Sequence, residues 1–254
     1  MNQTLLQVLM LFAAGLVAGS INVVAGGGSM ITLPLMIFLG LPPTVANGTN
    51  RVAILVQNVG AVWGFSRRGF FETPWLRFVA PPAILGALLG TWMGVVIGDA
   101  PFQRILAVVM VLVAVWTVWK PPRSGEGAPV DPAGLSRKAR TLFLGVFFLV
   151  GVFGGFIQAG IGFLILGATS ALGLDLVRGN ALKVLLVLLF TPLALAGYAM
   201  AGRVDWAMGI ALACGNLVGS QVGVRFTVLK GHAWVRRVVV VMVVLFALRL
   251  LIWA

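Results

Sequence analysis

Two cationic side chains, Arg51 and Lys183, fall inside apolar segments of this chain. If those segments span a membrane, each cation lies below its surface, where an unpaired charge costs about 2.5–3.5 kcal/mol or more. The acidic residues all fall in connectors or at the edges of apolar segments, so no carboxylate is placed to neutralise the cations. A bound small anion would be a suitable counter-ion, and we expect an anion site near the two cations.

Polar side chains near the cations could complete the hydrogen bonds of such an anion. They are Asn22, Ser29, Asn47, Thr49, Asn50, Gln57 and Asn58 in the first half of the chain, and Gln158 and Asn180 in the second. The alternative is that both cations snorkel to a membrane interface, since each side chain is long enough to do so. The polar run from Asn47 to Asn50 favours the anion site, because a lipid-facing surface would not need it.

A glycine-rich segment precedes each of these cations in the sequence, and each is expected to break a helix. The first reads Ala25-Gly26-Gly27-Gly28-Ser29 and the second reads Gln158-Ala159-Gly160-Ile161-Gly162. Non-helical backbone at membrane depth is tolerated only where protein or a water-filled cavity satisfies its polar groups. A helix that restarts after a break aims free N–H groups and the positive end of its dipole at the gap, which suits an anion. The sequence therefore predicts anion binding at both breaks; the alternative is that the glycines only permit close packing or form a surface loop.

The composition indicates that these elements lie in a membrane. Hydrophobic residues make up 60% of the 254 residues, charged residues make up 9%, and the mean hydropathy is +1.08. A soluble globule with these values would have too little polar surface, so we expect an all-α integral membrane protein. The net charge of +12 comes mostly from connectors and segment ends, where cations meet lipid headgroups. We expect contact with membrane lipid and no binding of nucleic acid.

About eight transmembrane helices are expected, at 5–24, 44–66, 75–97, 102–119, 139–157, 177–201, 206–226 and 234–253. Two further apolar segments, 29–41 and 162–174, follow the glycine breaks. At about 1.5 Å per residue they are too short to cross a ~30 Å hydrocarbon layer, so we expect half-helices or re-entrant segments. A polar linker, 120–138, is expected to join a first transmembrane repeat, 1–119, to a second, 139–254.

The two halves of the chain are similar in sequence. At a shift of 133 residues, Gly27 meets Gly160 and Asn47 meets Asn180. At a shift of 129, the ladder Gly86-Gly90-Gly94 meets Gly215-Gly219-Gly223, and each ladder is expected to let another helix approach closely. Transporters commonly consist of two related halves with the substrate between them. Whether the repeats are parallel or inverted depends on how the short segments run, which the sequence leaves open.

The chain lacks the residues that other functional classes need. There is no GxxxxGK[ST] phosphate loop, no HExxH metal helix, and no pair of carboxylates within a span to act as acid and base. The single His232 lies in a connector, and the single Cys214 allows neither an intrachain disulfide nor a multi-cysteine metal site. We expect no enzyme, no metal and no cofactor. A passive anion channel and a non-transporting membrane scaffold stay open as alternatives to a transporter.

Three motifs in the first half are specific enough to indicate a family. They are Gly-Ser-x-Asn-x-x-Ala-Gly-Gly-Gly-Ser from Gly19 to Ser29, Leu-Pro-Leu from Leu33 to Leu35, and Ala-Asn-Gly-Thr-Asn-Arg from Ala46 to Arg51. Together they strongly resemble the sulfite exporter TauE/SafE family, and the resemblance covers the whole chain. The second half departs from the pattern, with Arg178-Gly179-Asn180-Ala181-Leu182-Lys183 in place of a matching Asn-x-Thr-Asn run.

This resemblance implies a secondary transporter that exports small sulfur-containing oxyanions, such as sulfite or organosulfonates, by alternating access between two repeats. It also implies a multi-pass protein of the bacterial inner (cytoplasmic) membrane. The sequence leaves open whether transport is coupled to protons and whether the protein forms a homodimer. The expected binding set joins both breaks to the two cations: Asn22, Gly26, Gly27, Gly28, Ser29, Asn47, Thr49, Asn50, Arg51, Gln158, Gly160, Gly162, Asn180 and Lys183.

The first break provides a direct test of the cavity that the glycines predict. Replacing Gly27 with Val should block transport, because it forces a branched side chain into the break. The measurement is the initial rate of anion transport in proteoliposomes that hold equal amounts of folded protein. A fully active Gly27→Val protein would count against the predicted cavity.

Overall fold

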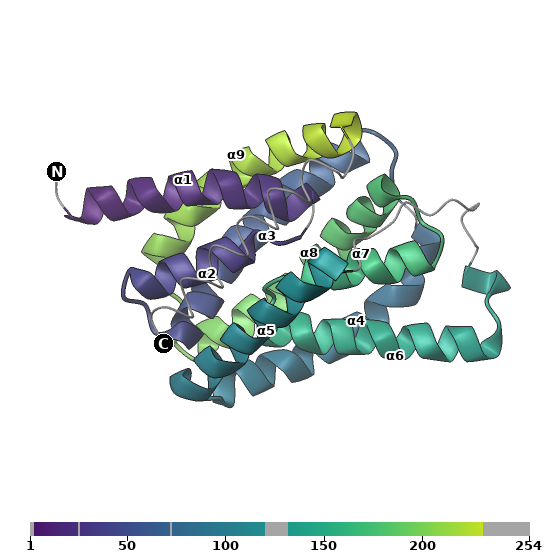
Figure 1. Cartoon of the computed structure of the whole chain (residues 1–254), viewed down its shortest axis with the longest axis horizontal. Coiled ribbons are helices and arrows are strands. Elements are labelled where there is room, and N and C mark those ends of the chain that lie inside the picture. The colour runs from purple at the N-terminus through teal and green to yellow at the C-terminus, as the bar shows by residue number, and fades with distance from the viewer. Residues whose placement is uncertain (1–2, 25, 72, 120–131, 231–254) are drawn as a thin grey trace.

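The computed structural model describes residues 3–24, 26–71, 73–119 and 132–230 (Figure 1). Every regular element in that part of the chain is a helix. The elements are α1 Gln3–Val24, α2 Ser29–Phe38, α3 Pro43–Ser66, α4 Thr73–Val96, α5 Asp99–Trp119, a single 3-10 turn at Pro132–Gly134, α6 Arg137–Phe156, α7 Ile161–Ala171, α8 Leu176–Met200 and α9 Trp206–Lys230.

Long helices occupy the expected positions wherever the structure describes them. Five of these helices are long and apolar enough to span a membrane: α1 from Leu5, α4, α6, α8, and α9 up to Thr227. The helix α3 is not among them, because its amide side chains and Arg51 lower its hydropathy. The expected segment at 234–253 lies outside the described residues. The described part of the chain is therefore all-helical and consistent with a multi-pass membrane protein, and the count of eight crossings stays a prediction.

The outer faces of the helices suit a lipid environment. Large apolar side chains such as Leu85, Trp92, Leu149 and Ile210 are exposed on α4, α6 and α9. By contrast, α3 lies in the interior and buries most of its polar side chains. The distribution is the reverse of that in a soluble helical bundle, since polar groups gather inside and apolar groups face outwards.

Helix α1 runs beside α9 and in the same direction (Figure 1). A Cβ built on Gly215 would lie 2.0 Å from the carbonyl oxygen of Phe12, and one on Gly223 would lie 2.7 Å from that of Ser20. Because both residue numbers rise together along the contact, the two helices are parallel. Glycine lets their backbones touch.

Helix α3 also runs in the direction of α9, so α1 and α3 point the same way. Thr49, near the start of α3, accepts a hydrogen bond from the backbone of Asp205, and Gly64, near its end, packs on Val224. The chain between α1 and α3 must therefore return to the side from which α1 began. The ten-residue helix α2 makes this return, which identifies it as a re-entrant segment.

Helices α6 and α8 run in the opposite direction. Tyr198, near the end of α8, contacts Asn47 at the start of α3, while Ala181 at the start of α8 shares an apolar cluster with Phe65 at the end of α3. The last residue of α6, Phe156, also lies beside Asn47. The eleven-residue helix α7 then returns the chain before α8 begins.

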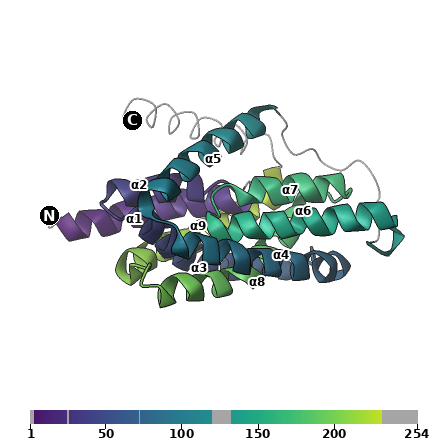
Figure 2. The same ribbon diagram turned by 90° about the horizontal axis from the view of Figure 1, so that it is seen from below.

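The glycine ladder of α4 packs against α6, and the two helices lie side by side in both views (Figures 1 and 2). A Cβ on Gly86 would lie 2.0 Å from the oxygen of Phe148, and one on Gly90 would lie 1.9 Å from the oxygen of Val152. Each ladder therefore packs on a helix from the other half of the chain. Figure 2 shows α5 on the outside of the bundle.

The α4–α6 contact predicts a loss of stability when a glycine within it gains a methyl group. A Cβ on Gly151 would lie 2.0 Å from the oxygen of Ala83, so Gly151→Ala should cost about 1–3 kcal/mol and lower the thermal midpoint in detergent. Gly145 lies on the same helix with nothing within 4 Å of its Cβ position, so Gly145→Ala should be neutral or slightly stabilising. Equal midpoints for the two variants, measured by tryptophan fluorescence, would contradict this packing.

Candidate functional site

The two glycine breaks touch each other in the interior. A Cβ on Gly26 would lie 2.1 Å from the Cα of Gly162, and one on Gly162 would lie 2.2 Å from the Cα of Gly26. Gly26 has φ 83°, and Gly160 has φ 76°. Both angles lie in the left-handed region that favours glycine. The breaks therefore cross backbone to backbone, and a side chain at either contact position would separate them.

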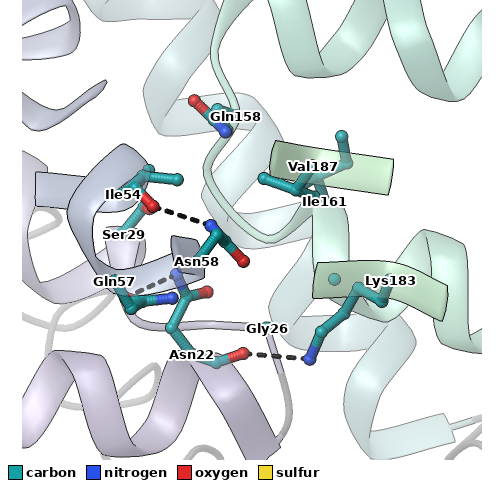
Figure 3. A pocket seen from close by; sticks show the side chains of 11 residues that line it. Asn22, Gly26, Ser29, Ile54, Gln57, Asn58, Gln158, Ile161, Lys183 and Val187 are labelled. Atoms are coloured by element: carbon teal, nitrogen blue, oxygen red, sulfur yellow. Dashed lines mark hydrogen bonds between the residues drawn. The ribbon is translucent and has the colours of Figure 1, made fainter. Parts of the chain in front are cut away.

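A cavity lies beside this crossing, and Figure 3 shows its lining. The residues around it are Asn22, Gly26, Ser29, Ile54, Gln57, Asn58, Gln158, Ile161, Gly162, Lys183 and Val187. Lys183 is the only charged side chain among them, and the other polar groups are amides and one hydroxyl. The cavity is therefore polar and carries a net positive charge when Lys183 is protonated.

The helices α2 and α7 both begin at the cavity. In α2 the first backbone bond runs from Met30 to Gly27, and in α7 a corresponding bond runs from Phe163 to Gly160. Among the described residues, the N–H groups of Ser29 and Gly162 have no acceptor. The positive ends of two helix dipoles thus meet at one place, an arrangement that suits an anion.

Lys183 binds the opposite end of the first break, where α1 stops. Its Nζ donates to the carbonyl oxygens of Asn22 at 3.0 Å and Val23 at 2.8 Å, and to Oδ1 of Asn180 at 2.6 Å. The amide of Asn180 donates to the carbonyl of Val24 at 3.1 Å. A cation and an amide from α8 therefore cap the negative end of α1.

Arg51 caps α6 in the same manner. Its guanidinium donates to the carbonyls of Gly154 at 3.1 Å and Gly155 at 2.6 Å, and to the side chain of Gln158 at 3.0 Å. The amide of Asn47 donates to the carbonyl of Phe156 at 2.8 Å. Each broken helix is thus closed by a cation and an asparagine from the other half of the chain.

These contacts change the interpretation of the two cations. Arg51 is 0% exposed and Lys183 is 3% exposed, so neither side chain snorkels to the surface. Backbone carbonyls at the ends of α1 and α6 supply the partners that were expected from a bound anion. A bound anion is therefore not required to explain why either charge is buried.

Several expected binding residues line the cavity and others support it. Asn22, Gly26, Ser29, Gln158, Gly162 and Lys183 form part of its lining. Gly27, Gly28 and Gly160 shape the turns, and Asn180 and Arg51 hold residues of the breaks.

Three residues of the expected set lie away from the cavity and serve other contacts. Asn47 binds Phe156, Thr49 binds Asp205, and Asn50 accepts a hydrogen bond from Thr32 at 2.7 Å. The polar side chains of Asn47, Thr49 and Asn50 therefore form hydrogen bonds mainly to other segments of the chain.

Gln57 and Asn58 line the cavity. The sequence offered both as hydrogen-bond partners for an anion, although the expected binding set did not include them. Oε1 of Gln57 accepts from Asn22 at 3.1 Å and from Asn216 at 3.2 Å, which leaves its amide NH2 directed at the cavity (Figure 3). The helical spacing from Arg51 through Ile54 to Gln57 and Asn58 places these residues on one face of α3, and this periodicity could have identified them.

The cavity gathers one cation and several hydrogen-bond donors, which are groups that suit a small oxyanion. Its donors are the ammonium of Lys183, the amide of Gln57, the hydroxyl of Ser29 and the N–H groups at the starts of α2 and α7. The described residues contain no group of three His, Cys, Asp or Glu side chains that could hold a metal ion.

The comparisons with known proteins agree with one another and indicate a single family. Residues 11–250 match the family model described as Sulfite exporter TauE/SafE. A probable membrane transporter protein, ORF9, of Sinorhizobium sp. is 32% identical over 247 residues, covering 95% of this chain and 91% of the relative. One of Haemophilus influenzae is 27% identical, covering 91% and 89%. YfcA of Escherichia coli K12, also a probable membrane transporter protein, is 24% identical, covering 95% and 88%. No solved structure matches the chain.

The capping contacts predict that Arg51 stabilises the fold without any anion. Arg51→Met removes the donors to Gly154 and Gly155, and each buried carbonyl left without a partner costs about 1–3 kcal/mol. The thermal midpoint in detergent should fall in anion-poor buffer. Arg67→Met is the control, because Arg67 stacks on Trp63 at the exposed end of α3 and caps no break. If the midpoint of Arg51→Met lies below that of the wild type only when an anion is present, Arg51 binds the anion instead.

Proposed function

Since the chain belongs to the sulfite exporter TauE/SafE family, we propose that it is a secondary transporter that exports small sulfur-containing oxyanions such as sulfite or organosulfonates. The observation that carries the proposal is the cavity where the two breaks cross. Lys183 and the starts of α2 and α7 make this cavity positive, and no carboxylate lines it. A small anion is the ligand class that these groups favour.

The helix directions support alternating access between inverted repeats. Residues 1–119 and 139–254 would form the two repeats, in which α1, α3 and α4 correspond to α6, α8 and α9. Helices α3 and α8 run antiparallel, and α1 and α6 point in opposite directions. The re-entrant α2 and α7 explain this, because each returns the chain to the side from which α1 or α6 began. Helix α1 with α2 then makes no net crossing, and α3, α4 and α5 leave three net crossings before α6 begins. The cavity then lies near the axis that relates the repeats, as in other transporters of this design.

The electrical gradient favours export of an anion from a bacterial cell. Moving one charge across 100 mV corresponds to about 2.3 kcal/mol, so a negative interior would drive a monoanion outward through the inner membrane. Sulfite titrates near neutral pH, so the substrate can carry its own proton. The absence of carboxylates from the cavity lining argues against an Asp or Glu proton relay there.

A carrier explains the cavity better than the alternatives do. A passive channel needs a continuous water-filled path, whereas the two breaks are in backbone contact at Gly26 and Gly162. A membrane scaffold needs no polar cavity lined by a cation. An anion carrier accounts for both features.

The test is uptake of sulfite into proteoliposomes under an imposed inside-positive potential, compared with protein-free liposomes. A carrier should give saturable uptake that depends on the protein. Asn58→Leu should reduce it, since Asn58 lines the cavity, and Cys214→Ser is the matched control because Cys214 is exposed on α9. Uptake that rises linearly with concentration would indicate a channel. No uptake of sulfite, thiosulfate or sulfoacetate by folded protein would contradict the proposed transport.

A further inference from the structure

Lys183 has two roles available to it in this structure, because its ammonium both lines the cavity and caps α1. Figure 3 shows the side chain reaching from α8 past the cavity to the carbonyl of Asn22. A second bond joins it to the carbonyl of Val23. The residue therefore connects the expected position of the anion to the end of a broken helix.

Arg51 differs from Lys183 in this respect. It caps α6 with comparable bonds, and its guanidinium stacks on the ring of Tyr198 at 4.6 Å, but it does not line the cavity. It reaches the cavity only through Gln158, whose amide is held between Arg51 and Thr191. The two cations thus have the same structural role but unequal access to a ligand.

The hydrogen bonds of Lys183 are already fully used. An ammonium has three N–H donors, and its acceptors here are Asn22, Val23 and Asn180. An anion in the cavity could bind Lys183 only by taking a donor from one of these neutral acceptors. The bonds from the ammonium to these neutral oxygens are charge-assisted already. An anion adds the attraction between two opposite charges, which is strong in a buried site of low dielectric constant, so the exchange favours the anion.

Such an exchange would loosen the contact between α1 and α8. Without Lys183, the bond from Asn180 to the carbonyl of Val24 is the remaining side-chain cap on α1. Helix α1 would stay attached to α9 through the glycine contact, while its end and the following break would be freed from α8.

We propose that Lys183 is the coupling residue of this transporter: binding of the anion withdraws its ammonium from the end of α1 and releases the first break, whereas Arg51 stays a fixed cap on α6. The inference rests on the proposed function and assigns different roles to the two buried cations. Lys183 contacts the anion directly. Arg51 is a positioning residue, which acts by holding Gln158 and the end of α6.

The experiment is hydrogen–deuterium exchange on the purified wild-type protein with and without sodium sulfite, with sodium chloride at equal ionic strength as the control. Sulfite should speed amide exchange at residues 20–28 and leave residues 152–158 unchanged. Binding of sulfite is measured in parallel by calorimetry. This comparison uses only the wild type, so it decides the proposal even if a variant fails to fold.

Two variants separate the roles of the cations. Lys183→Met should weaken sulfite binding by about tenfold or more, because it removes a charge-assisted bond, and should abolish the response of residues 20–28. Arg51→Lys keeps a charge at the end of α6, and since Arg51 does not line the cavity, this variant should keep the response of residues 20–28 at saturating sulfite.

Any other result would contradict either the coupling role of Lys183 or the proposed transport. Sulfite binding with unchanged exchange at residues 20–28 would overturn the coupling role and leave the proposed transport intact. Wild-type affinity in a folded Lys183→Met protein would do the same. If the folded wild type neither binds nor transports sulfite, thiosulfate or sulfoacetate, the proposed function fails and the coupling role fails with it.

Discussion

A helix that stops inside a membrane leaves its last carbonyl groups without partners, and neither water nor lipid can satisfy them. This chain stops two helices there, at Val24 and Phe156. Lys183 and Arg51 supply the missing donors, each from the other half of the chain. Because both breaks depend on these bonds, the buried cations belong to the architecture before they belong to any ligand.

The same bonds organise the electrostatics of the interior. Each break has a negative end, where α1 or α6 stops, and a positive end, where α2 or α7 begins. The cations occupy the negative ends, which leaves the positive ends to face the cavity beside Gly26 and Gly162. The protein thus contributes positive potential to the cavity largely through backbone dipoles and Lys183.

Glycine makes this arrangement sterically feasible. The ladders on α4 and α9 bring these helices into backbone contact with α6 and α1, the two helices that are broken. The broken helices are therefore held along their length by close packing and at their ends by hydrogen bonds.

The sequence by itself determined the membrane class, the long helices, the short segments after each break and the burial of two cations without carboxylates. Hydropathy, glycine runs and charge are local properties, which is why these predictions could be made. It could not decide that Arg51 faces carbonyls and not a ligand, that Gln57 and Asn58 line the cavity, or which way each helix runs. Those depend on contacts such as Arg51 to Gly154 and Lys183 to Val23, which join residues 103 and 160 positions apart. Only the tertiary structure brings such residues together, because packing between distant helices sets their partners.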